Sequence, residues 1–431
     1  MVGVTQRVLV VCIIERTPQI PRRVSRSGTR IVFSSAGLAE DMNPDLSPLA
    51  DALNAAEVDG YLLDASSEES DQLYLSGFDA PDPFVTLYTP DGTHLLVSGL
   101  EYGRATDESR ADSVARLADY GYQEKVAEYG RTEGKHRVVA AFVADHGVES
   151  VAAPERFPLG TADDLREQGV SVEVLDEDAL AEIRAVKTDD EIDHVHAAQQ
   201  ANEEAMRAAE DLLESATVED GVLYHDGEEL TSERVKEEIE VTLLRQGCAL
   251  DETIVACGAD AAGPHNRGSG PLEADETIVI DIFPRDKETK YHGDMTRTFV
   301  KGKASDEVRR RYDDTYDAFE AALDAVEPGA TGKEVHDAVC DCYEERGYDT
   351  LRSDPSAETG FIHSTGHGIG LDVHEEPSVS PDGGELEPGH VITIEPGLYD
   401  PEVGGIRIED LVVVTDEGYE NLTDYPIHLE L

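Results

Sequence analysis

The chain has 431 residues and carries 93 acidic against 35 basic residues, a formal net charge of −58 at pH 7. In such a chain the cations that neutralise phosphates are scarce, which argues against a nucleic-acid partner. Apolar residues make up 39% of the sequence and recur periodically, which excludes a disordered chain. The acids are spread over the whole chain, so we interpret them as a solvated shell suited to very high salt, where charge repulsion is screened within about 3 Å at 1 M.

Residues 1–41 differ from the rest of the chain in charge. They hold six Arg and three acids, a local charge of 6 − 3 = +3. Their apolar run VLVVCII is too short for a secretory signal, and no small-residue cleavage site follows it. We interpret residues 1–41 as a doubtful leader and expect Met42 to be the true first residue, with a targeting peptide as the alternative.

The cysteines and the apolar runs bear on location. Five cysteines are present without a C-x-x-C pair or a disulfide-like spacing, which makes a reducing cytoplasm the expected location. No apolar run approaches the length of about 18 residues that a membrane span needs, so no membrane partner is expected.

Residues 42–180 alternate short apolar runs with stretches of helical pattern. The runs are VDGYLLD, FVTLYTP, THLLVSG, HRVVAAFVAD and VSVEVL. Strands separated by segments of helix length predict an α/β domain with a mixed sheet. Nothing in this region has a catalytic pattern.

Residues 188–414 show the same order of elements twice. A helix is predicted from Thr188, where Thr188 and Glu191 have capping-box spacing, and a second helix follows in SERVKEEIEVTLLRQG. The strand runs ETIVID and MTRTFV come next. Two further helices follow, the second from Thr331 with Thr331 and Glu334 again in capping-box spacing, and then the strand runs VITIEP and RIEDLVVV. This pattern predicts a duplicated helix-helix-strand-strand unit, and a site between the halves would take side chains from both.

Asp281 ends one apolar strand and Asp294 begins the next, in IVIDIFPRDKETKYHGDMTRTF. A four-residue loop at 286–289 would pair Arg285 with Lys290 and place Asp281 directly opposite Asp294. Directly opposed side chains share one face of a sheet, with Cβ atoms about 4.5 to 5.5 Å apart. Two carboxylates so placed repel unless a cation lies between them. The alternative is one Asp in a turn and the other exposed to solvent.

The second pair of strands also carries two carboxylates among apolar residues. Glu395 and Glu409 lie within VITIEPGLYDPEVGGIRIEDLVVV, where an unpaired buried carboxylate would cost several kcal/mol. Four carboxylates and one imidazole would make an oxygen-rich set that suits a pair of divalent ions.

Three histidines in FIHSTGHGIGLDVHEEP, at 361–377, could supply the imidazole. His363 and His367 are four residues apart, as in the zinc motif H-E-x-x-H, but the residue after His363 is Ser and the alternating glycines disfavour a helix by about 1 kcal/mol each. We therefore predict extended backbone that passes close to a neighbour. His367, between two glycines, is the best candidate ligand.

The sequence resembles the pita-bread metallopeptidases, which include aminopeptidase P, prolidase and methionine aminopeptidase. The resemblance lies in the order of the five candidate ligands along the chain, Asp281, Asp294, His367, Glu395 and Glu409, and in the motifs around them. The motifs that carry the resemblance are GDMTRTF, HSTGHGIGLDVHEEP, ITIEPGLY and GGIRIEDLVVVT. The N-terminal region is similar to that of the aminopeptidase P, prolidase and creatinase branch, so that the resemblance covers residues 43–431.

The resemblance implies an α+β fold in two parts. A creatinase-like N-terminal α/β domain, expected at 42–180, would precede a pita-bread catalytic domain at 181–431 with its duplicated α-α-β-β unit. The chain departs from the family in one respect. The interval between Asp281 and Asp294 is 294 − 281 = 13 residues, which is longer than is usual in the family. A two-residue insertion keeps both side chains on one face, because side chains alternate with a period of two.

The resemblance also implies roles for individual residues. Asp294 and Glu409 would bridge two divalent ions, manganese first and cobalt, zinc or iron as alternatives, while Asp281 would complete one ion and His367 with Glu395 the other. Glu395 is our choice for the group that moves the proton of the attacking water. Three further histidines would surround the tetrahedral intermediate, and an arginine would support the metal-bound carboxylates: His265, His363, His374 and Arg407.

The implied reaction is hydrolysis of the bond before proline in a peptide with proline second, by a homodimer or larger homo-oligomer. A hydrolase of a small non-peptide amide such as ectoine is the enzymatic alternative. A metal-free pita-bread binding module is the alternative from another class, although such a module needs no set of five ligands.

Overall fold

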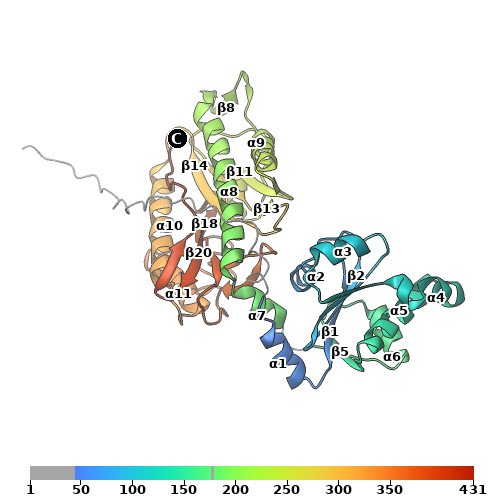
Figure 1. Ribbon diagram of the computed structural model, residues 1–431. Helices are drawn as coiled ribbons and strands as arrows, with labels where there is room; N and C mark the ends of the chain where they lie inside the picture. The colour runs from blue at the N-terminus through green and yellow to red at the C-terminus, as the bar shows by residue number, and fades with distance from the viewer. Residues whose placement is uncertain (1–43, 176–178) are drawn as a thin grey trace, which may run out of the picture. The chain divides into compact units, whose positions relative to one another are not determined.

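The computed structural model describes residues 44–175 and 179–431 (Figure 1). The interpretation of residues 1–41 as a leader lies outside this range. The α+β class is confirmed, with a mixed sheet and its helices in the N-terminal part and a separate set of helices and sheets in the C-terminal part. Among the described residues, no helix has both the length and the apolar character that crossing a bilayer would require.

The N-terminal part is built on the predicted mixed sheet, whose six strands have the order β4-β3-β2-β1-β5-β6. β1 runs antiparallel to β2 and parallel to β5. The strands are β1 Gly60–Ala65, β2 Phe84–Thr89, β3 Gly92–Val97, β4 Ser113–Arg116, β5 Ser150–Ala153 and β6 Ser171–Val174. The helices are α1 Ser47–Ala55, α2 Ser70–Ser76, α3 Tyr102–Glu108, α4 Tyr122–Tyr129, α5 Arg131–Asp145, α6 Leu159–Glu167 and α7 Ala179–Ala185.

Side chains of this sheet alternate between two apolar layers, as the period of a strand requires. On β1, Tyr61 and Leu63 pack with α1 and α2, whereas Leu62 between them packs with α5 and α6. Helices therefore cover both faces of the sheet (Figure 1).

The C-terminal part contains the predicted repeat, with strands that the sequence pattern did not indicate. Its helices are α8 Asp189–Ser215, α9 Ser232–Arg245, α10 Asp306–Ala325 and α11 Gly332–Glu345. The predicted strands are found as β12 Thr277–Ile282, β14 Met295–Val300, β17 Val391–Ile394 and β20 Asp410–Thr415. β19 Gly404–Arg407 shares only Arg407 with the last predicted run. The others are β7 Thr217–Glu219, β8 Val222–His225, β9 Glu228–Glu229, β10 Cys248–Ala249, β11 Thr253–Cys257, β13 Arg285–Asp286, β15 Gly366–Gly368, β16 Glu375–Val379, β18 Gly397–Asp400 and β21 Gly418–Asn421.

Capping residues fix where the long helices begin. Thr188 caps α8 and forms the predicted capping box with Glu191, and Thr331 and Glu334 do the same for α11. Each box satisfies N–H groups that the first helical turn leaves without acceptors. The helices then pack against the sheets that carry the four acidic site candidates.

The first acidic hairpin does not have the predicted register. Asp281 faces Thr296, so the direct pairing of Asp281 with Asp294 is wrong. Asp294 instead lies diagonally across from Asp281. Because the shift amounts to two residues, both carboxylates stay on one face of the hairpin, as the period of two requires.

The loop explains this shift. Arg285 bridges to His292 rather than to Lys290. The Asp286 side chain accepts the N–H groups of the second and third residues after it, at 2.9 and 2.7 Å. Lys290 then takes a left-handed φ of 71° and donates its N–H to the Asp286 carbonyl at 3.0 Å. This side-chain turn closes the loop one residue later than predicted.

The second acidic hairpin is a pair of ladders with one common register. Ile394 pairs with Asp410 in the β17–β20 ladder, and Gly397 pairs with Arg407 in the β18–β19 ladder. Glu395 and Glu409 lie opposite each other where the two ladders meet. They are thus at strand ends, and not within one continuous strand as the apolar pattern suggested.

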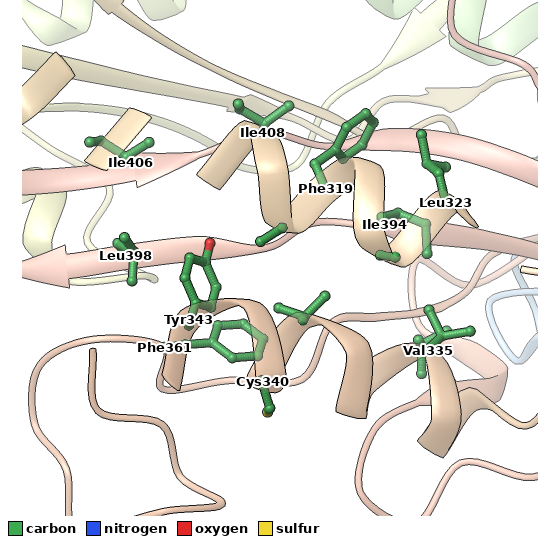
Figure 2. Close-up of a cluster of buried hydrophobic side chains, with 14 of the residues drawn as sticks. Phe319, Leu323, Val335, Cys340, Tyr343, Phe361, Ile394, Leu398, Ile406 and Ile408 are labelled. Carbon is green, nitrogen blue, oxygen red and sulfur yellow. The ribbon is translucent and has the colours of Figure 1, made fainter. Parts of the chain in front are cut away.

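The core behind this hairpin is a layer of apolar side chains from α10, α11 and the strands (Figure 2). Ile394, Ile406 and Ile408 point into it, and each is at most 1% exposed. Their neighbours Glu395, Arg407 and Glu409 have the opposite parity along the strand, so they point away from the core. Core packing therefore directs the polar side chains toward one common face. Other members of the layer are Phe319, Leu323, Val335, Cys340, Tyr343, Phe361 and Leu398.

One buried arginine joins β14 to the C-terminal end of the chain. Arg297 is 0% exposed. Its guanidinium carries five N–H donors, and it makes five hydrogen bonds of 2.7 to 3.1 Å. The acceptors are the carbonyls of Thr296, Glu409, Tyr425 and Pro426 and the carboxylate of Asp410.

Candidate metal centre

The four acidic residues and His367 line a single cavity of about 910 Å³. Ligand atoms of Asp294, His367 and Glu409 all lie within 4.8 Å of one another. His367 Nε2 is 3.7 Å from Asp294 Oδ2 and 3.6 Å from Glu395 Oε1. These separations are too long for hydrogen bonds, and they fit ligands that share an ion with bonds of about 2.1 Å.

The tautomer of His367 suits a metal ligand. Its Nδ1 lies 3.1 Å from the carbonyl oxygen of Gly368, so this nitrogen carries the proton and donates it. Nε2, which faces the carboxylates, is left with its lone pair. Burial and the neighbouring His374 ring lower the pKa of His367 to about 3, which keeps the imidazole neutral. An orienting hydrogen bond from the other ring nitrogen is the usual arrangement of a metal-bound histidine.

Three of the carboxyl groups have raised pKa values. Burial, followed by the charges of Glu409, Asp281 and Glu395, raises the pKa of Asp294 well above its ordinary value. Burial raises the pKa of Glu395 to about 8, and burial with the charge of Glu395 raises the pKa of Glu409. Like charges held this close in a buried site favour bound cations, since a divalent ion removes both the repulsion and the desolvation cost.

Asp281 is held by an arginine. Its Oδ2 pairs with Nη2 of Arg407, which is 4% exposed. Its Oδ1 is buried and has no hydrogen-bond partner among the described residues. A buried carboxylate oxygen of this kind ordinarily has a partner, and a cation fits the position. The donor set as a whole, hard oxygens with one imidazole, is therefore suited to divalent metal ions.

Arg407 also connects to Glu409 through a hydroxyl. Its Nε donates to Thr296 Oγ1 at 3.0 Å, and Thr296 Oγ1 donates to Glu409 Oε2 at 2.8 Å. Its Nη1 donates to the Tyr399 hydroxyl at 2.9 Å. One guanidinium thus fixes carboxylates on both acidic hairpins, in keeping with the supporting role implied for it.

The other predicted histidines divide into one that is partly buried and two that are exposed. His363 donates from Nδ1 to the carbonyl of Ser364 at 2.6 Å, and its Nε2 accepts from the Tyr399 hydroxyl at 3.0 Å. Burial lowers the pKa of His363 to about 3. His265 and His374 are exposed and line the same cavity. The His374 ring packs edge-on against the His367 ring, with 4.3 Å between the ring centroids.

The glycines around His367 permit close contact between strands, as the sequence predicted. A Cβ on Gly366 would lie 2.0 Å from the carbonyl oxygen of Thr393, and one on Gly368 would lie 2.2 Å from that of Glu376. These neighbours are the main chains of the flanking strands. The glycines therefore let β15 pack between β16 and β17, which sets the position of His367.

Sequence reasoning missed four residues that contact the candidate ligands or their supports: Gln199, Thr296, Arg297 and Tyr399. An arginine in the middle of the apolar run MTRTFV was a visible signal for Arg297. The others stand in ordinary patterns, and only the folded chain shows their contacts.

Comparison with known proteins shows the family to which the chain belongs. Residues 193–416 match Metallopeptidase family M24, and residues 46–186 match the Creatinase/Prolidase N-terminal domain. An Xaa-Pro dipeptidase of Pyrococcus horikoshii is 28% identical over 387 residues, which cover 89% of this chain and 97% of that protein. An Xaa-Pro dipeptidase of Pyrococcus furiosus is 34% identical over 251 residues, 57% of this chain and 65% of that protein.

Solved structures show the same likeness over both parts of the chain. The Xaa-Pro dipeptidase from Bacillus anthracis superposes with a TM-score of 0.74 at 26% identity, covering 90% of this chain and 99% of the other. The X-Pro aminopeptidase from Thermotoga maritima gives a TM-score of 0.71 at 26% identity, with 88% and 100% covered. The resemblance found in the sequence is thereby confirmed: the chain belongs to metallopeptidase family M24, in the branch that carries a creatinase/prolidase N-terminal domain.

Proposed function

We propose that the chain is a hydrolase dependent on two divalent metal ions, which it uses to cleave the bond before proline in Xaa-Pro peptides. The observation that carries the proposal is the cluster of three carboxyl groups with raised pKa values around the unprotonated Nε2 of His367. Asp281, with its buried unpartnered oxygen, completes the set. Five side chains would hold the ions: Asp281, Asp294, His367, Glu395 and Glu409.

Within this set, Asp294 and Glu409 would be shared between the two ions, Asp281 would bind one, and His367 with Glu395 the other. Bound ions of this kind lower the pKa of a water molecule toward neutrality and polarise a scissile carbonyl. Manganese is our first choice, with cobalt, zinc or iron as alternatives, because oxygen ligands and one imidazole accept all of them.

The residues of the chain then move the proton and orient the substrate. Glu395 lines the cavity beside His367, where its carboxylate can take the proton of the attacking water and pass it to the leaving nitrogen. His363 is held by Ser364 and Tyr399, while His265 and His374 line the cavity where they can donate to the carbonyl oxygen of the substrate. Arg407 keeps Asp281 in place.

One assay tests the proposal and separates the substrate classes. In molar salt with Mn²⁺, we expect hydrolysis of an Xaa-Pro dipeptide or an Xaa-Pro-Yaa tripeptide. Cleavage of the dipeptide alone defines a prolidase, cleavage of the tripeptide defines an aminopeptidase P, and hydrolysis of ectoine alone refutes the peptidase assignment. Absence of stoichiometric Mn, Co, Fe or Zn from the purified protein would refute the metal enzyme and favour a binding module.

Other parts of the proposal concern setting and organisation. The net charge of −58 supports activity in very high salt, and the cytoplasm is the proposed location. We also propose a homodimer or larger homo-oligomer. The division into 42–180 and 181–431 is supported by two separate family matches, although the N-terminal match at 46–186 extends six residues past the proposed boundary and the M24 match begins at residue 193.

A further inference from the structure

α8 buries polar side chains on the face that meets the first acidic hairpin. Gln199 and Asn202, one helical turn apart, are each 0% exposed. The other buried residues of α8 include Ala198, Ala201 and Met206, and one acid, Glu203, which accepts the Asp424 N–H at 2.7 Å. A buried amide costs free energy unless its donors and acceptor find partners, so these contacts restrict which arrangements of the hairpin are stable.

Gln199 hydrogen-bonds the main chain of Asp294 on both sides. Its Oε1 accepts the Asp294 N–H at 2.9 Å, and its Nε2 donates to the Asp294 carbonyl at 2.9 Å. The ladder that joins β14 to β12 ends at Met295, one residue beyond Asp294. The side-chain amide of Gln199 therefore satisfies the main-chain groups of Asp294 as a neighbouring strand would.

The same amide reaches the strand that follows Glu409. Gln199 Nε2 also donates to Thr423 Oγ1 at 2.8 Å, and Thr423 Oγ1 accepts the Leu411 N–H at 3.0 Å. Asn202 adds a second link, because its Nδ2 donates at 2.6 Å to the carbonyl of Ile282, the residue after Asp281. One helix face thus holds the main chain beside three of the four candidate carboxylates.

The packing of α8 against the hairpin leaves no room at residue 293. A Cβ on Gly293 would lie 2.9 Å from Ala198 C, Gln199 N and Gln199 Oε1. Real Cβ atoms do not approach other atoms this closely, so a glycine before Asp294 is what allows the amide to reach the main chain. The contact between α8 and the hairpin therefore depends on both residues, on the amide of Gln199 and on the missing side chain of Gly293.

We propose that Gln199 is a positioning residue for the metal centre, which fixes the main chain of Asp294 so that its carboxylate stays within binding distance of His367. The inference rests on the proposed metal-binding role of Asp294. The carboxylates around Asp294 repel one another before metal binds, and a rigid main chain keeps them from moving apart. A looser main chain would bind metal more weakly although the fold and all five ligands remain.

The test compares Gln199→Met with Gln200→Met in the full chain, in molar salt. Gln199→Met keeps the length of the side chain and removes its hydrogen bonds, whereas Gln200 is an exposed neighbour on the same helix and serves as the matched control. We expect Gln199→Met to bind Mn²⁺ roughly 10- to 100-fold more weakly by calorimetry, the range known for residues that orient metal ligands. Gln200→Met should match the wild type.

Three further readouts separate positioning from a general loss of structure. Far-UV circular dichroism of metal-free Gln199→Met should match the wild type, its Co²⁺ absorption spectrum should change, and saturating Mn²⁺ should restore kcat with KM for an Xaa-Pro substrate unchanged. If Gln199→Met does not fold, Gln199→Glu replaces it, because the carboxylate still accepts the Asp294 N–H but repels its carbonyl. The same weakening of Mn²⁺ binding is expected.

Wild-type affinity in either folded variant would overturn the inference. Failure of the wild type itself to bind metal would instead refute the proposed function, so the two failures are distinguishable.

Discussion

The two acidic hairpins hold their main chains by different means. The N–H and the carbonyl of Asp294 are both held by the side chain of Gln199, whereas the N–H groups of Glu395 and Glu409 donate to main-chain carbonyls, that of Thr365 at 2.8 Å and that of Thr296 at 3.1 Å. The carbonyl of Glu409 accepts from a side chain, that of Arg297, which is one of the polar supports of the second hairpin. A side-chain contact can be removed by one substitution, but a main-chain contact cannot. The first hairpin should therefore be sensitive at single positions, and the second only through its ligands, its apolar core and its polar supports.

Removing a ligand from the second hairpin should have the largest effect. Glu409→Gln replaces a buried carboxylate by a neutral amide of the same shape. We expect kcat/KM to fall by roughly 10³-fold or more, which corresponds to about 4 kcal/mol of transition-state stabilisation. Bound metal, measured by elemental analysis, should fall as well, while circular dichroism stays unchanged. Glu420→Gln on the exposed strand β21 is the matched control, and an active, metal-replete Glu409→Gln would refute the ligand assignment.

A cavity in the core of the second hairpin should affect stability more than metal binding. Ile394→Ala removes a fully buried side chain next to Glu395, and such truncations cost about 2 to 5 kcal/mol of unfolding free energy. Urea unfolding at fixed salt measures the loss, with the half-exposed Leu351→Ala as control. Because main-chain contacts hold Glu395, the Mn²⁺ affinity of the folded fraction should stay within about threefold of the wild type. A loss of affinity as large as that of Gln199→Met would remove the contrast between the hairpins.

Tyr399→Phe tests the polar support of the second hairpin. The change leaves Arg407 Nη1 and His363 Nε2 without the hydroxyl they share, and an unsatisfied buried polar group costs about 1 to 3 kcal/mol. We expect kcat to fall by roughly 5- to 150-fold, with a smaller change in metal content than in Glu409→Gln. Steady-state kinetics against Tyr316→Phe, which alters a tyrosine on the outer face of α10, provides the comparison. Wild-type kcat would show that the hydroxyl does not orient either partner.

The smallest effect concerns pH. His336 packs against Phe361 and contacts Thr365 Oγ1 at 3.0 Å, and burial lowers its pKa from 6.5 to about 4. Between these pH values the unfolded chain binds a proton that the folded chain does not, so the stability contributed by neutral His336 is lost as pH falls. Between these two pH values, His336→Gln should make the free energy of unfolding less dependent on pH, by at most about 1.4 kcal/mol per pH unit. Chemical unfolding of both proteins at pH 7.5, 6 and 5 measures the difference, and equal slopes would contradict it.

Local patterns predicted the parts of this fold that depend on neighbouring residues. The capping boxes at Thr188 and Thr331 were confirmed, and the period of two kept Asp281 and Asp294 on one face although the loop was wrong. The register was missed because the side chain of Asp286 closes the turn, an effect that strand patterns do not contain.

Contacts between distant parts of the chain could not be predicted in the same way. Gln199 meets Asp294 across 95 residues, and Arg407 meets Thr296 across 111. Glutamine on a helix and threonine in a strand are ordinary in sequence, and their role appears only when the elements pack. The candidate ligands could be predicted because carboxylates next to apolar strands stand out on energetic grounds.

The guanidinium of Arg297 has a consequence for the order in which the chain folds. Four of its five hydrogen bonds go to residues 409–426, more than a hundred positions further along the chain. During synthesis the first acidic hairpin emerges well before those acceptors, and until they arrive a buried cation would stand unpaired. The catalytic domain therefore reaches its native state only when its last strands are complete, as one cooperative unit and not half by half.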